Sequence, residues 1–464
     1  MIRLISKLCA VAGLFAAVPA LSAPDPTTFR TQLDDYMTRE MRERHVPGAA
    51  VAVLHKGEIV VAKGYGRATL EHDVPVTRDT IFQSGSVGKM FTAALVMKLV
   101  ERGEIGLDDP LSQYLPDAPE SWRPITIRHL LTHTSGVANY TGDFDFRRDY
   151  TDDELVKFAY ALPLDFQPGS RWSYSNTGYV LLGIIVKKKT GTSYLDLLAT
   201  EVFKPLGMKT AQGITEADIV PNRASGYQLV GGVLKNQDWV SPTMNRTADG
   251  SLYFSLNDMI AWARAVEKGE VLSAAGWTQV YAPVKLNSGN PYPYGFGWSL
   301  DEADGKPRLH HGGAWQGFRT YYSRYLGEDL AVILLTNSSS AEVSSFTDGI
   351  AKLWNPALVA PGPRPRPEPA IEPRVAALIE RARAGTLRKE DLPLASKGFA
   401  EAANQYFAPM LKDAGPLKSL ELVERRQLGD DVAYSYKAML GDRAFTIAYQ
   451  VAPGDKVSSF MIEK

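Results

Sequence analysis

Cysteine is almost absent from this sequence. The one cysteine among the 464 residues is Cys9, which lies in the N-terminal segment 1–22. If that segment is removed, the mature chain has no cysteine, which excludes a disulfide framework, a thiol nucleophile and a thiolate metal site. Cys9 also lies too close to the start of the chain to be a typical site of lipid attachment.

An excess of charge of either sign is absent as well. The chain has 51 lysine and arginine residues against 52 acidic residues, a formal net charge of −1. This balance gives no reason to expect nucleic acid or another polyanion as a partner. Hydrophobic residues make up 45% and charged residues 22% of the sequence, which is ordinary for a soluble protein of more than one domain.

Two well-known signatures are missing. No G-x-S-x-G elbow occurs, which argues against an alpha/beta-hydrolase. No glycine-rich phosphate loop occurs either, so the sequence does not indicate a nucleotide-binding protein.

The apolar run near the N-terminus, 8–18, is too short to span a bilayer. Arg3 and Lys7 lie before or at the start of this run and small residues follow it, as in a secretory signal peptide. We therefore expect a signal peptide at 1–22, cleaved after Ser22, and a periplasmic or secreted protein with no stable membrane insertion after cleavage. The alternative is an uncleaved membrane anchor.

A proline-rich segment divides the rest of the chain. Prolines recur from 361 to 369, where neither a helix nor a central strand can continue. We expect an extended linker at 361–373. It separates a large domain at 24–360 from a small domain at 374–464.

The large domain shows strand patterns at both of its ends. A helix is predicted at 29–44, a hairpin at 49–62, a buried strand at 330–335 and a helix at 341–354. Long helical patterns lie between these two ends. This order predicts an α+β fold in which an antiparallel sheet carries an inserted helical region.

The small domain is also predicted to be α+β. Helical stretches at 373–384 and 398–412 precede four strand-like stretches, at 420–425, 432–440, 445–451 and 457–462. The middle two strands alternate apolar with smaller or polar residues, which indicates one buried face. The domain has no cluster of catalytic residue types. Its role stays open between shielding the site, mediating dimerisation and binding a polymeric substrate.

The run Ser86-Val87-Gly88-Lys89 carries the chemistry predicted for the large domain. Apolar residues at helical spacing continue to Arg102, so Ser86 is expected at a helix N-terminus, where backbone N–H groups favour negative charge. Lys89 returns to the same face one turn later. A desolvated lysine tends to lose its proton, and a neutral amine beside a serine is a competent general base. Alone, this spacing also fits a capping serine with an unrelated lysine.

The surroundings of this run resemble a known family. Six segments occur in the family's order: 82–92, 103–110, 125–136, 168–176, 294–298 and 311–318. Through them the chain resembles the beta-lactamase-related serine hydrolases, a family of class C beta-lactamases, some penicillin-binding proteins, D-aminopeptidases and certain carboxylesterases. The resemblance implies a beta-lactamase/transpeptidase-like fold, with Ser86 as the nucleophile and Lys89 as its base.

The resemblance also implies roles for two further motifs. In Tyr174-Ser175-Asn176, a Y-x-N motif, the tyrosine relays protons and Asn176 hydrogen-bonds the lysine and the substrate. We expect positive charge nearby to hold the Tyr174 hydroxyl partly ionised. In His311-Gly312-Gly313, an H-x-G motif, His311 and Gly313 orient the substrate. The N–H of Ala314 is expected to form the oxyanion hole with the N–H of Ser86.

His311 stands where class C enzymes carry a lysine. Because histidine is mostly neutral above pH 6.5, the site is expected to lose much of its attraction for a substrate carboxylate. This favours an ester, a small amide or a short peptide as the substrate, without a cofactor. We expect a carboxylesterase or a D-amino-acid-type peptidase that acts through an acyl-enzyme. A beta-lactamase, a penicillin-binding protein with slow turnover and a non-catalytic binding scaffold remain alternatives.

His129 and His133 have the i, i+4 spacing of helical metal ligands. They lack the intervening glutamate of zinc proteases, and in the family this stretch is structural. We therefore expect no metal site. The oligomeric state is left open.

Overall fold

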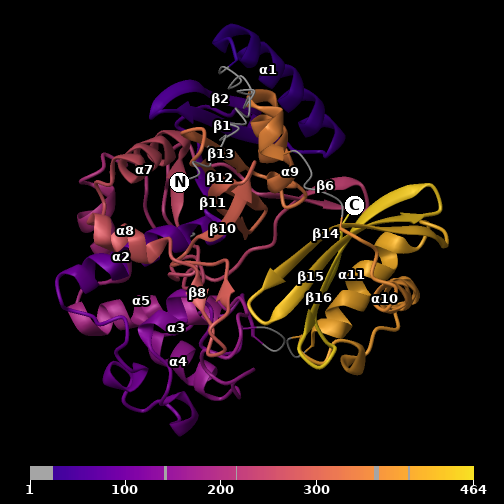
Figure 1. Cartoon of the computed structure of the whole chain (residues 1–464). Helices are drawn as coiled ribbons and strands as arrows, with labels where there is room; N and C mark the ends of the chain where they lie inside the picture. The colour runs from indigo at the N-terminus through magenta and orange to yellow at the C-terminus, as the bar shows by residue number, and fades with distance from the viewer. Residues whose placement is uncertain (1–23, 141–143, 216, 360–364, 396–397, 464) are drawn as a thin grey trace, which may run out of the picture.

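A seven-stranded antiparallel sheet forms the centre of the large domain (Figure 1). The computed structural model describes residues 24–140, 144–215, 217–359, 365–395 and 398–463. The signal peptide expected at 1–22 lies outside them, as does part of the expected linker. In sheet order the strands are β10 (Ser299–Ala303), β11 (Lys306–Trp315), β12 (Phe318–Tyr325), β13 (Leu330–Thr336), β1 (Gly48–His55), β2 (Glu58–Thr69) and β3 (Val74–Pro75).

The central strands β1 and β13 are buried on both faces. Successive side chains of a strand point to opposite faces, so Val51 and Val53 belong to one core while Ala50 and Ala52 belong to another. Helices α1 (Pro26–Glu43) and α9 (Val343–Trp354) pack on the first face. The inserted helical region covers the second face, which explains why both strands are almost wholly apolar.

The inserted region places two helices in its interior. Helices α2 and α5 are apolar on nearly every side, which is typical of a buried helix. The helices of this region are α2 (Gly88–Glu101), α3 (Ile127–Leu131), α4 (Asp152–Tyr160), α5 (Asn176–Thr190), α6 (Tyr194–Leu198), α7 (Leu256–Lys268) and α8 (Ala274–Val280). Three two-stranded pairs accompany them: β4 (Ile81–Gln83) with β7 (Tyr253–Ser255), β5 (Tyr227–Val230) with β6 (Val233–Asn236), and β8 (Val284–Lys285) with β9 (Pro291–Tyr292).

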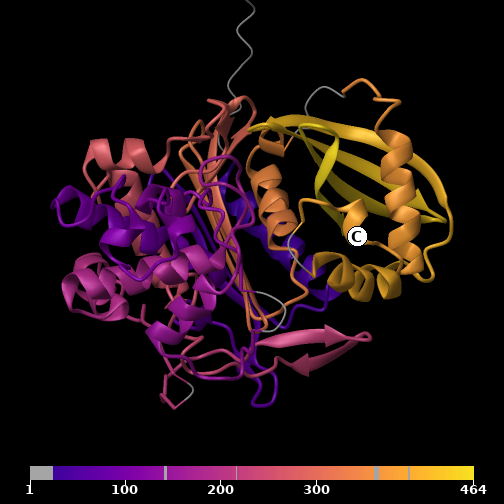
Figure 2. The same cartoon turned by 90° about the horizontal axis from the view of Figure 1, so that it is seen from below.

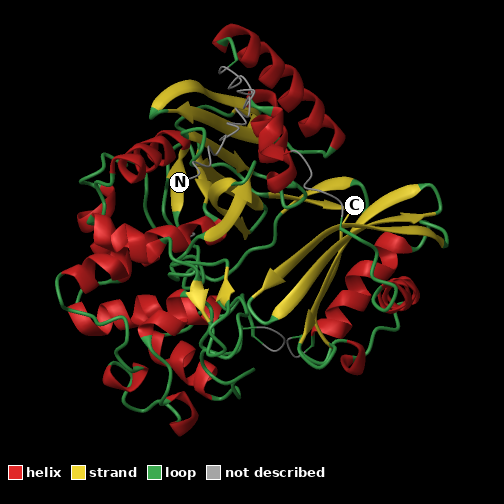
Figure 3. Ribbon diagram, viewed as in Figure 1, coloured by secondary structure: helices red, strands yellow, loops and turns green. Residues whose placement is uncertain are grey.

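The C-terminal part has its own sheet and its own core (Figure 2). Strands β14 (Leu417–Leu428), β15 (Asp431–Leu440), β16 (Arg443–Ala452) and β17 (Lys456–Glu463) pair antiparallel in chain order. Helices α10 (Glu372–Ala384) and α11 (Phe399–Leu411) cover one face (Figure 3). All six predicted elements are present; β14 is longer at both ends than the sequence pattern indicated. The α+β prediction is correct for both parts of the chain.

The turn between β14 and β15 rests on the large domain. The Gly429 N–H donates to the Pro291 carbonyl at 3.1 Å, and the Asn290 amide donates to the Asp430 carboxylate at 2.6 Å. Asp431 lies 3.6 Å from the Arg171 guanidinium, three residues before Tyr174 in the chain. The C-terminal sheet therefore contacts the segment that carries the Y-x-N motif.

We expect Gly429→Val to weaken this contact. Gly429 has φ +61°, and a Cβ there would lie 2.6 Å from a methyl of Leu286. Strained backbone costs about 1–3 kcal/mol and overpacking a similar amount. Gly454→Val is the matched control, because Gly454 has φ +76° but no atom within 4 Å of its Cβ position. In urea unfolding, Gly429→Val should lose at least about 1 kcal/mol more than the control; equal losses would contradict a tight contact.

Candidate active site

Ser86 lies in a 3₁₀ turn, Gly85–Val87, that leads into α2 at Gly88. The regular helix thus begins two residues later than the sequence pattern predicted. Gly85 has φ +49°, and a Cβ there would overlap the main chain of Ala314. Only glycine therefore allows β11 to approach this turn so closely.

The same close approach brings the two predicted oxyanion donors onto segments that touch. A Cβ on Gly313 would lie 3.0 Å from the Ser86 nitrogen, and the Ala314 nitrogen is the nearest atom to the Cβ position of Gly85. The turn at Ser86 and the strand segment at Ala314 are therefore in direct contact. Two backbone N–H donors can stabilise the negative oxygen of a tetrahedral intermediate. The oxyanion role of Ser86 and Ala314 stays a prediction.

Lys89 is fully buried beside Ser86. Its Nζ lies 3.2 Å from Ser86 Oγ and 2.7 Å from Asn176 Oδ1, and it also hydrogen-bonds the main-chain carbonyl of Asp249. Burial lowers the pKa of Lys89 to about 7, against the opposing effect of the Asp249 charge. A neutral amine donates two hydrogen bonds and accepts one, so Lys89 can donate to Asn176 and Asp249 and accept from the Ser86 hydroxyl.

Tyr174 differs from its sequence-based prediction. Its ring lies 4.8 Å from Lys89 Nζ. Its hydroxyl faces Ser86, but it makes no hydrogen bond that meets the usual distance and angle limits with any described residue. Burial raises the pKa of Tyr174 well above its ordinary value, although Ser86 lowers it in part. This direction contradicts the prediction of a partly ionised tyrosine, because the effect of burial outweighs that of the Ser86 hydroxyl. A neutral Tyr174 hydroxyl can accept one proton while it gives up another.

The start of α5 positions the Y-x-N motif. Ser175 is the N-cap of this helix, and its hydroxyl accepts a hydrogen bond from the Gly178 N–H. The Asn176 N–H donates to Asn139 Oδ1 at 2.9 Å. The structure thus brings together all four residues that the sequence assigned to proton transfer and positioning: Ser86, Lys89, Tyr174 and Asn176.

His311 is the end of a hydrogen-bonded chain beneath the site. The Ser175 N–H donates to His133 Nδ1 at 3.1 Å, so the neutral His133 ring carries its hydrogen on Nε2. That nitrogen lies 3.2 Å from the Tyr294 hydroxyl, which lies 2.9 Å from His311 Nε2. Tyr294 therefore donates to His311, and His311 Nδ1–H donates to the Gly312 carbonyl at 2.7 Å.

These hydrogen bonds, together with burial, leave His311 without a charge and without a free N–H. Burial, together with the neighbouring Lys89 charge, lowers the pKa of His311 to about 3. His133 also has a pKa well below its ordinary value, chiefly because of burial. The sequence motifs contained both His133 and Tyr294 but gave neither of them a role; only their contacts with His311 show one.

The two histidines at i, i+4 do not form a metal site. His129 closes the N-terminus of α3, where its Nδ1 accepts from the Thr126 N–H, while His133 belongs to the chain under the active site. Within the part of the chain that the structure describes, no group of three or more histidine, cysteine or acidic side chains could hold a metal ion. None of the residues discussed requires a cofactor.

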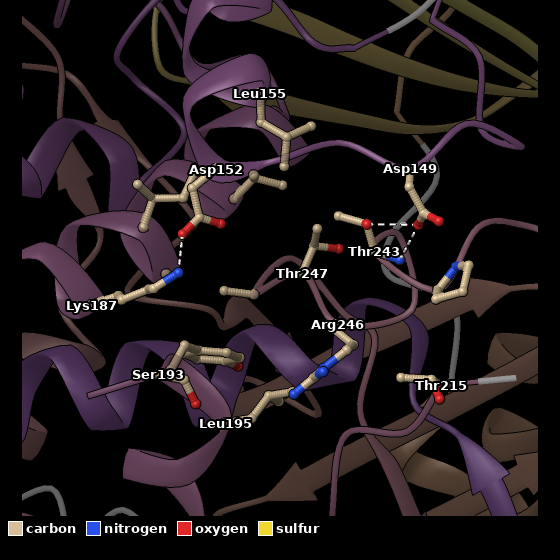
Figure 4. Close-up of a pocket in the computed structure, with 16 residues that line it drawn as sticks. Asp149, Asp152, Leu155, Lys187, Ser193, Leu195, Thr215, Thr243, Arg246 and Thr247 are labelled. Carbon is tan, nitrogen blue, oxygen red and sulfur yellow. Dashed lines mark hydrogen bonds and ion pairs between the residues drawn. The ribbon is translucent and has the colours of Figure 1, made fainter. Parts of the chain in front are cut away.

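A cavity of about 490 Å³, drawn in Figure 4, is lined by none of the site residues named above. Its walls come from α4, α5, α6 and the segment that precedes Asp249. Figure 4 shows the Asp152–Lys187 ion pair at one end and Asp149 bound to Thr243 at the other. Thr247 and Ala248 line this cavity, so the segment on which Asp249 lies separates it from Lys89.

Comparison with known proteins agrees with this geometry. The model of the Beta-lactamase family matches residues 33–353. Penicillin-binding protein 4* of Bacillus subtilis is 30% identical over 67% of this chain and 72% of its own length. A D-aminopeptidase of Gluconobacter oxydans is 32% identical over 64% of this chain, but the match spans only 57% of that relative.

The fold extends the likeness to the C-terminal part. The octameric penicillin-binding protein homologue from Pyrococcus abyssi superposes with a TM-score of 0.62 at 24% identity, over 93% of this chain and 95% of that one. The family match covers the whole region that holds Ser86, Lys89, Tyr174 and His311. This chain is a serine hydrolase that belongs to the beta-lactamase family.

Proposed function

We propose that this protein hydrolyses small amino-acid amides and short peptides with a D-residue on the acyl side, and esters of the same acids, through an acyl-enzyme on Ser86. The observation that carries the proposal is the neutral His311, with both ring nitrogens occupied. A site of this kind has no cation in the position where a substrate carboxylate would need one.

Acylation begins with the neutral amine of Lys89. It takes the proton of the Ser86 hydroxyl, 3.2 Å away, as Oγ attacks the substrate carbonyl. The carbonyl oxygen gains negative charge and is stabilised by the N–H groups of Ser86 and Ala314. The positive end of α2 adds to this stabilisation, since the attacked carbon lies at its N-terminus.

Tyr174 completes the proton transfer. Because its hydroxyl stays neutral and faces Ser86, it can pass a proton from the Lys89 ammonium to the leaving amine while it takes another. The C–N bond then breaks and the acyl-enzyme remains. In the second half of the reaction, Lys89 and Tyr174 activate a water molecule in the same way, and Ser86 leaves.

His311 disfavours substrates that depend on a free carboxylate. A lysine ammonium about 4 Å from a carboxylate contributes about 4 kcal/mol at the effective dielectric constant of a protein surface. His311 contributes no such attraction because its pKa of about 3 keeps it neutral at physiological pH. Penicillins and peptides that end in D-alanine should therefore acylate Ser86 poorly.

Two further observations support the acyl side of the proposal. Trp315 follows the oxyanion donor Ala314 directly, and its ring packs edge-on against Phe146 at 5.8 Å. An aromatic neighbour fits an apolar substrate side chain better than a charged one. The preference for a D-residue rests on the D-aminopeptidase relative. The penicillin-binding relative supports a second candidate, a receptor that acylates and turns over slowly.

A panel of chromogenic substrates tests the proposal. D-alanine p-nitroanilide should be hydrolysed with a kcat/KM at least about 100-fold above that for nitrocefin, a difference of about 2.7 kcal/mol that lies within the missing carboxylate attraction of about 4 kcal/mol. L-alanine p-nitroanilide and a p-nitrophenyl ester complete the panel. Fast nitrocefin hydrolysis would overturn the argument from His311. Stoichiometric labelling of Ser86 without turnover would favour the slow receptor. No reaction with any of these substrates would favour a non-catalytic binding scaffold.

We also propose that the protein is periplasmic or secreted. The charged start and short apolar run of 1–22 support this, although that segment lies outside the described residues. Among the residues that are described, no helix is long and apolar enough to cross a membrane. The mass of the exported protein, which should begin at Ala23, tests both the compartment and the cleavage site.

A further inference from the structure

Asp249 is a buried acidic residue that touches the catalytic lysine. Its side chain is 7% exposed, and its main-chain carbonyl accepts a hydrogen bond from Lys89 Nζ. Its carboxylate Oδ2 accepts a hydrogen bond from the hydroxyl of Tyr140. The other carboxylate oxygen, Oδ1, is buried and has no hydrogen-bond partner among the residues that the structure describes.

Such a carboxylate needs a positive charge nearby. A buried carboxylate with an unbonded oxygen is strongly disfavoured unless a cation compensates it. The carbonyl that binds Lys89 and the carboxylate belong to one residue, so the acid lies near the amine without a direct ion pair, and its charge raises the pKa of Lys89 against the effect of burial. His133 and His311, which also feel the Lys89 charge, are neutral and supply no cation.

The other groups around Lys89 cannot take this role. Tyr174 and Tyr179 present their rings to its Nζ, at 4.8 and 5.3 Å. Burial raises the pKa of Tyr140 and of Tyr174 well above the ordinary value, and the Asp249 charge raises each further, so both remain neutral hydroxyls. Tyr194, on the far side of Asp249, behaves in the same way. Asp249 is thus the acidic residue that contacts Lys89, through its carbonyl, and whose charge acts on the amine.

We propose that Asp249 is the buried counter-ion of Lys89 during acylation. This inference rests on the proposed Ser86–Lys89 chemistry. The proton of Ser86 moves to Lys89 as the Oγ–C bond forms, and the resulting ammonium is held by Asn176 Oδ1 and the Asp249 main-chain carbonyl. The Asp249 carboxylate acts on it through space, as a charge of the same residue. When the C–N bond breaks, the proton leaves through Tyr174 to the amine. Asp249 neither gives nor takes a proton in these steps and does not touch the substrate, so it is a positioning residue.

The test is a pH profile of Asp249→Asn, which removes the charge and keeps the size, the main-chain carbonyl and an acceptor for Tyr140. Without the counter-ion the Lys89 ammonium is less favourable, so the acidic limb of kcat/KM should move down by about one pH unit. The plateau should fall about 10-fold, because a weaker base removes the Ser86 proton less well. KM should change little.

Asp149→Asn is the matched control. Asp149 lines the cavity on the other side of the Asp249 segment, where it binds Thr243, and its loss removes the same charge. Its profile should coincide with that of the wild type. Asp249→Ser covers a failure of the asparagine variant to fold, because serine removes the charge with a smaller side chain.

Labelling of Ser86 by a fluorophosphonate gives a readout that is independent of the substrate. Its rate should show the same shift of about one pH unit in both Asp249 variants. If a folded Asp249 variant labels and turns over substrate with an unshifted midpoint of its pH profile, the counter-ion proposal alone is overturned. Asp249 would then have a structural role. Wild-type protein that neither turns over substrate nor labels at Ser86 would overturn the proposed function and the counter-ion together.

Discussion

Ser86→Ala is expected to abolish hydrolysis of D-alanine p-nitroanilide, with a fall in kcat/KM of at least about 10⁴-fold. Alanine removes the only oxygen that Lys89 and Tyr174 are arranged to activate. It keeps the two backbone N–H groups of the oxyanion hole, so the variant should still bind substrate with a similar KM. Steady-state kinetics and fluorophosphonate labelling measure the two effects separately.

Ser84→Ala is the control for this prediction. Ser84 lies two residues before Ser86 in the chain and is fully buried. Its hydroxyl donates to the Gly250 carbonyl and accepts from the Leu252 N–H, and it does not hydrogen-bond the catalytic groups. Its loss should lower the free energy of unfolding by about 1–3 kcal/mol and change kcat far less than Ser86→Ala does. Full activity in Ser86→Ala would show that the nucleophile has been misassigned and would remove the basis of the mechanism.

Lys89→Met is expected to have the second largest effect, a loss of about 10²–10⁴-fold in kcat/KM, because it removes the general base. In the wild type the active form is the neutral amine, with a pKa of about 7. Activity should therefore be low at pH 5, rise about tenfold per pH unit below pH 7, and level off above pH 8. His311 adds no limb between pH 5 and 9, since its pKa is about 3.

Stability separates this loss from a folding defect. The folded-state pKa of Lys89 is lowered, so the unfolded chain binds more protons between pH 7 and 10, and below this window the ionised lysine opposes folding. The shift from 10.5 to about 7 corresponds to about 4–5 kcal/mol before the hydrogen bonds lost on substitution are counted. Lys89→Met should thus be inactive yet no less stable at pH 6 than the wild type. Lys98→Met, in the last turn of the same helix, should keep its activity. A Lys89→Met enzyme with the activity of the wild type would contradict the role of the base.

The local elements were predictable because their side-chain patterns are local. The helix that follows Ser86 and the four strands of the C-terminal sheet repeat apolar residues with the periods of their own backbones, 3.6 and 2. The spacing of Ser86 and Lys89 needs only one helical turn, so the sequence placed the amine beside the hydroxyl without reference to the rest of the fold. The ends of these elements were less predictable, since the 3₁₀ turn at Ser86 depends on β11 packing against Gly85.

The contact between the C-terminal sheet and the large domain was not predictable from the sequence. Nothing in the turn at Gly429 indicates which surface it meets, because Pro291 and Arg171 lie more than a hundred residues away in the chain. The sequence left the role of the C-terminal domain open. The structure adds that its sheet rests against the segment that carries Tyr174.

The sequence alone predicted the nucleophile, its base, the H-x-G motif and the α+β fold, since each depends on residue types at short spacing or on an ordered set of motifs. The charges of the site residues depend on the folded structure. Burial keeps Tyr174 protonated, Tyr294 and His133 fix the tautomer of His311, and Asp249 approaches Lys89 from a segment 160 residues further along the chain. Ionisation depends on desolvation and on neighbours from every packed element, and no spacing within one segment records these.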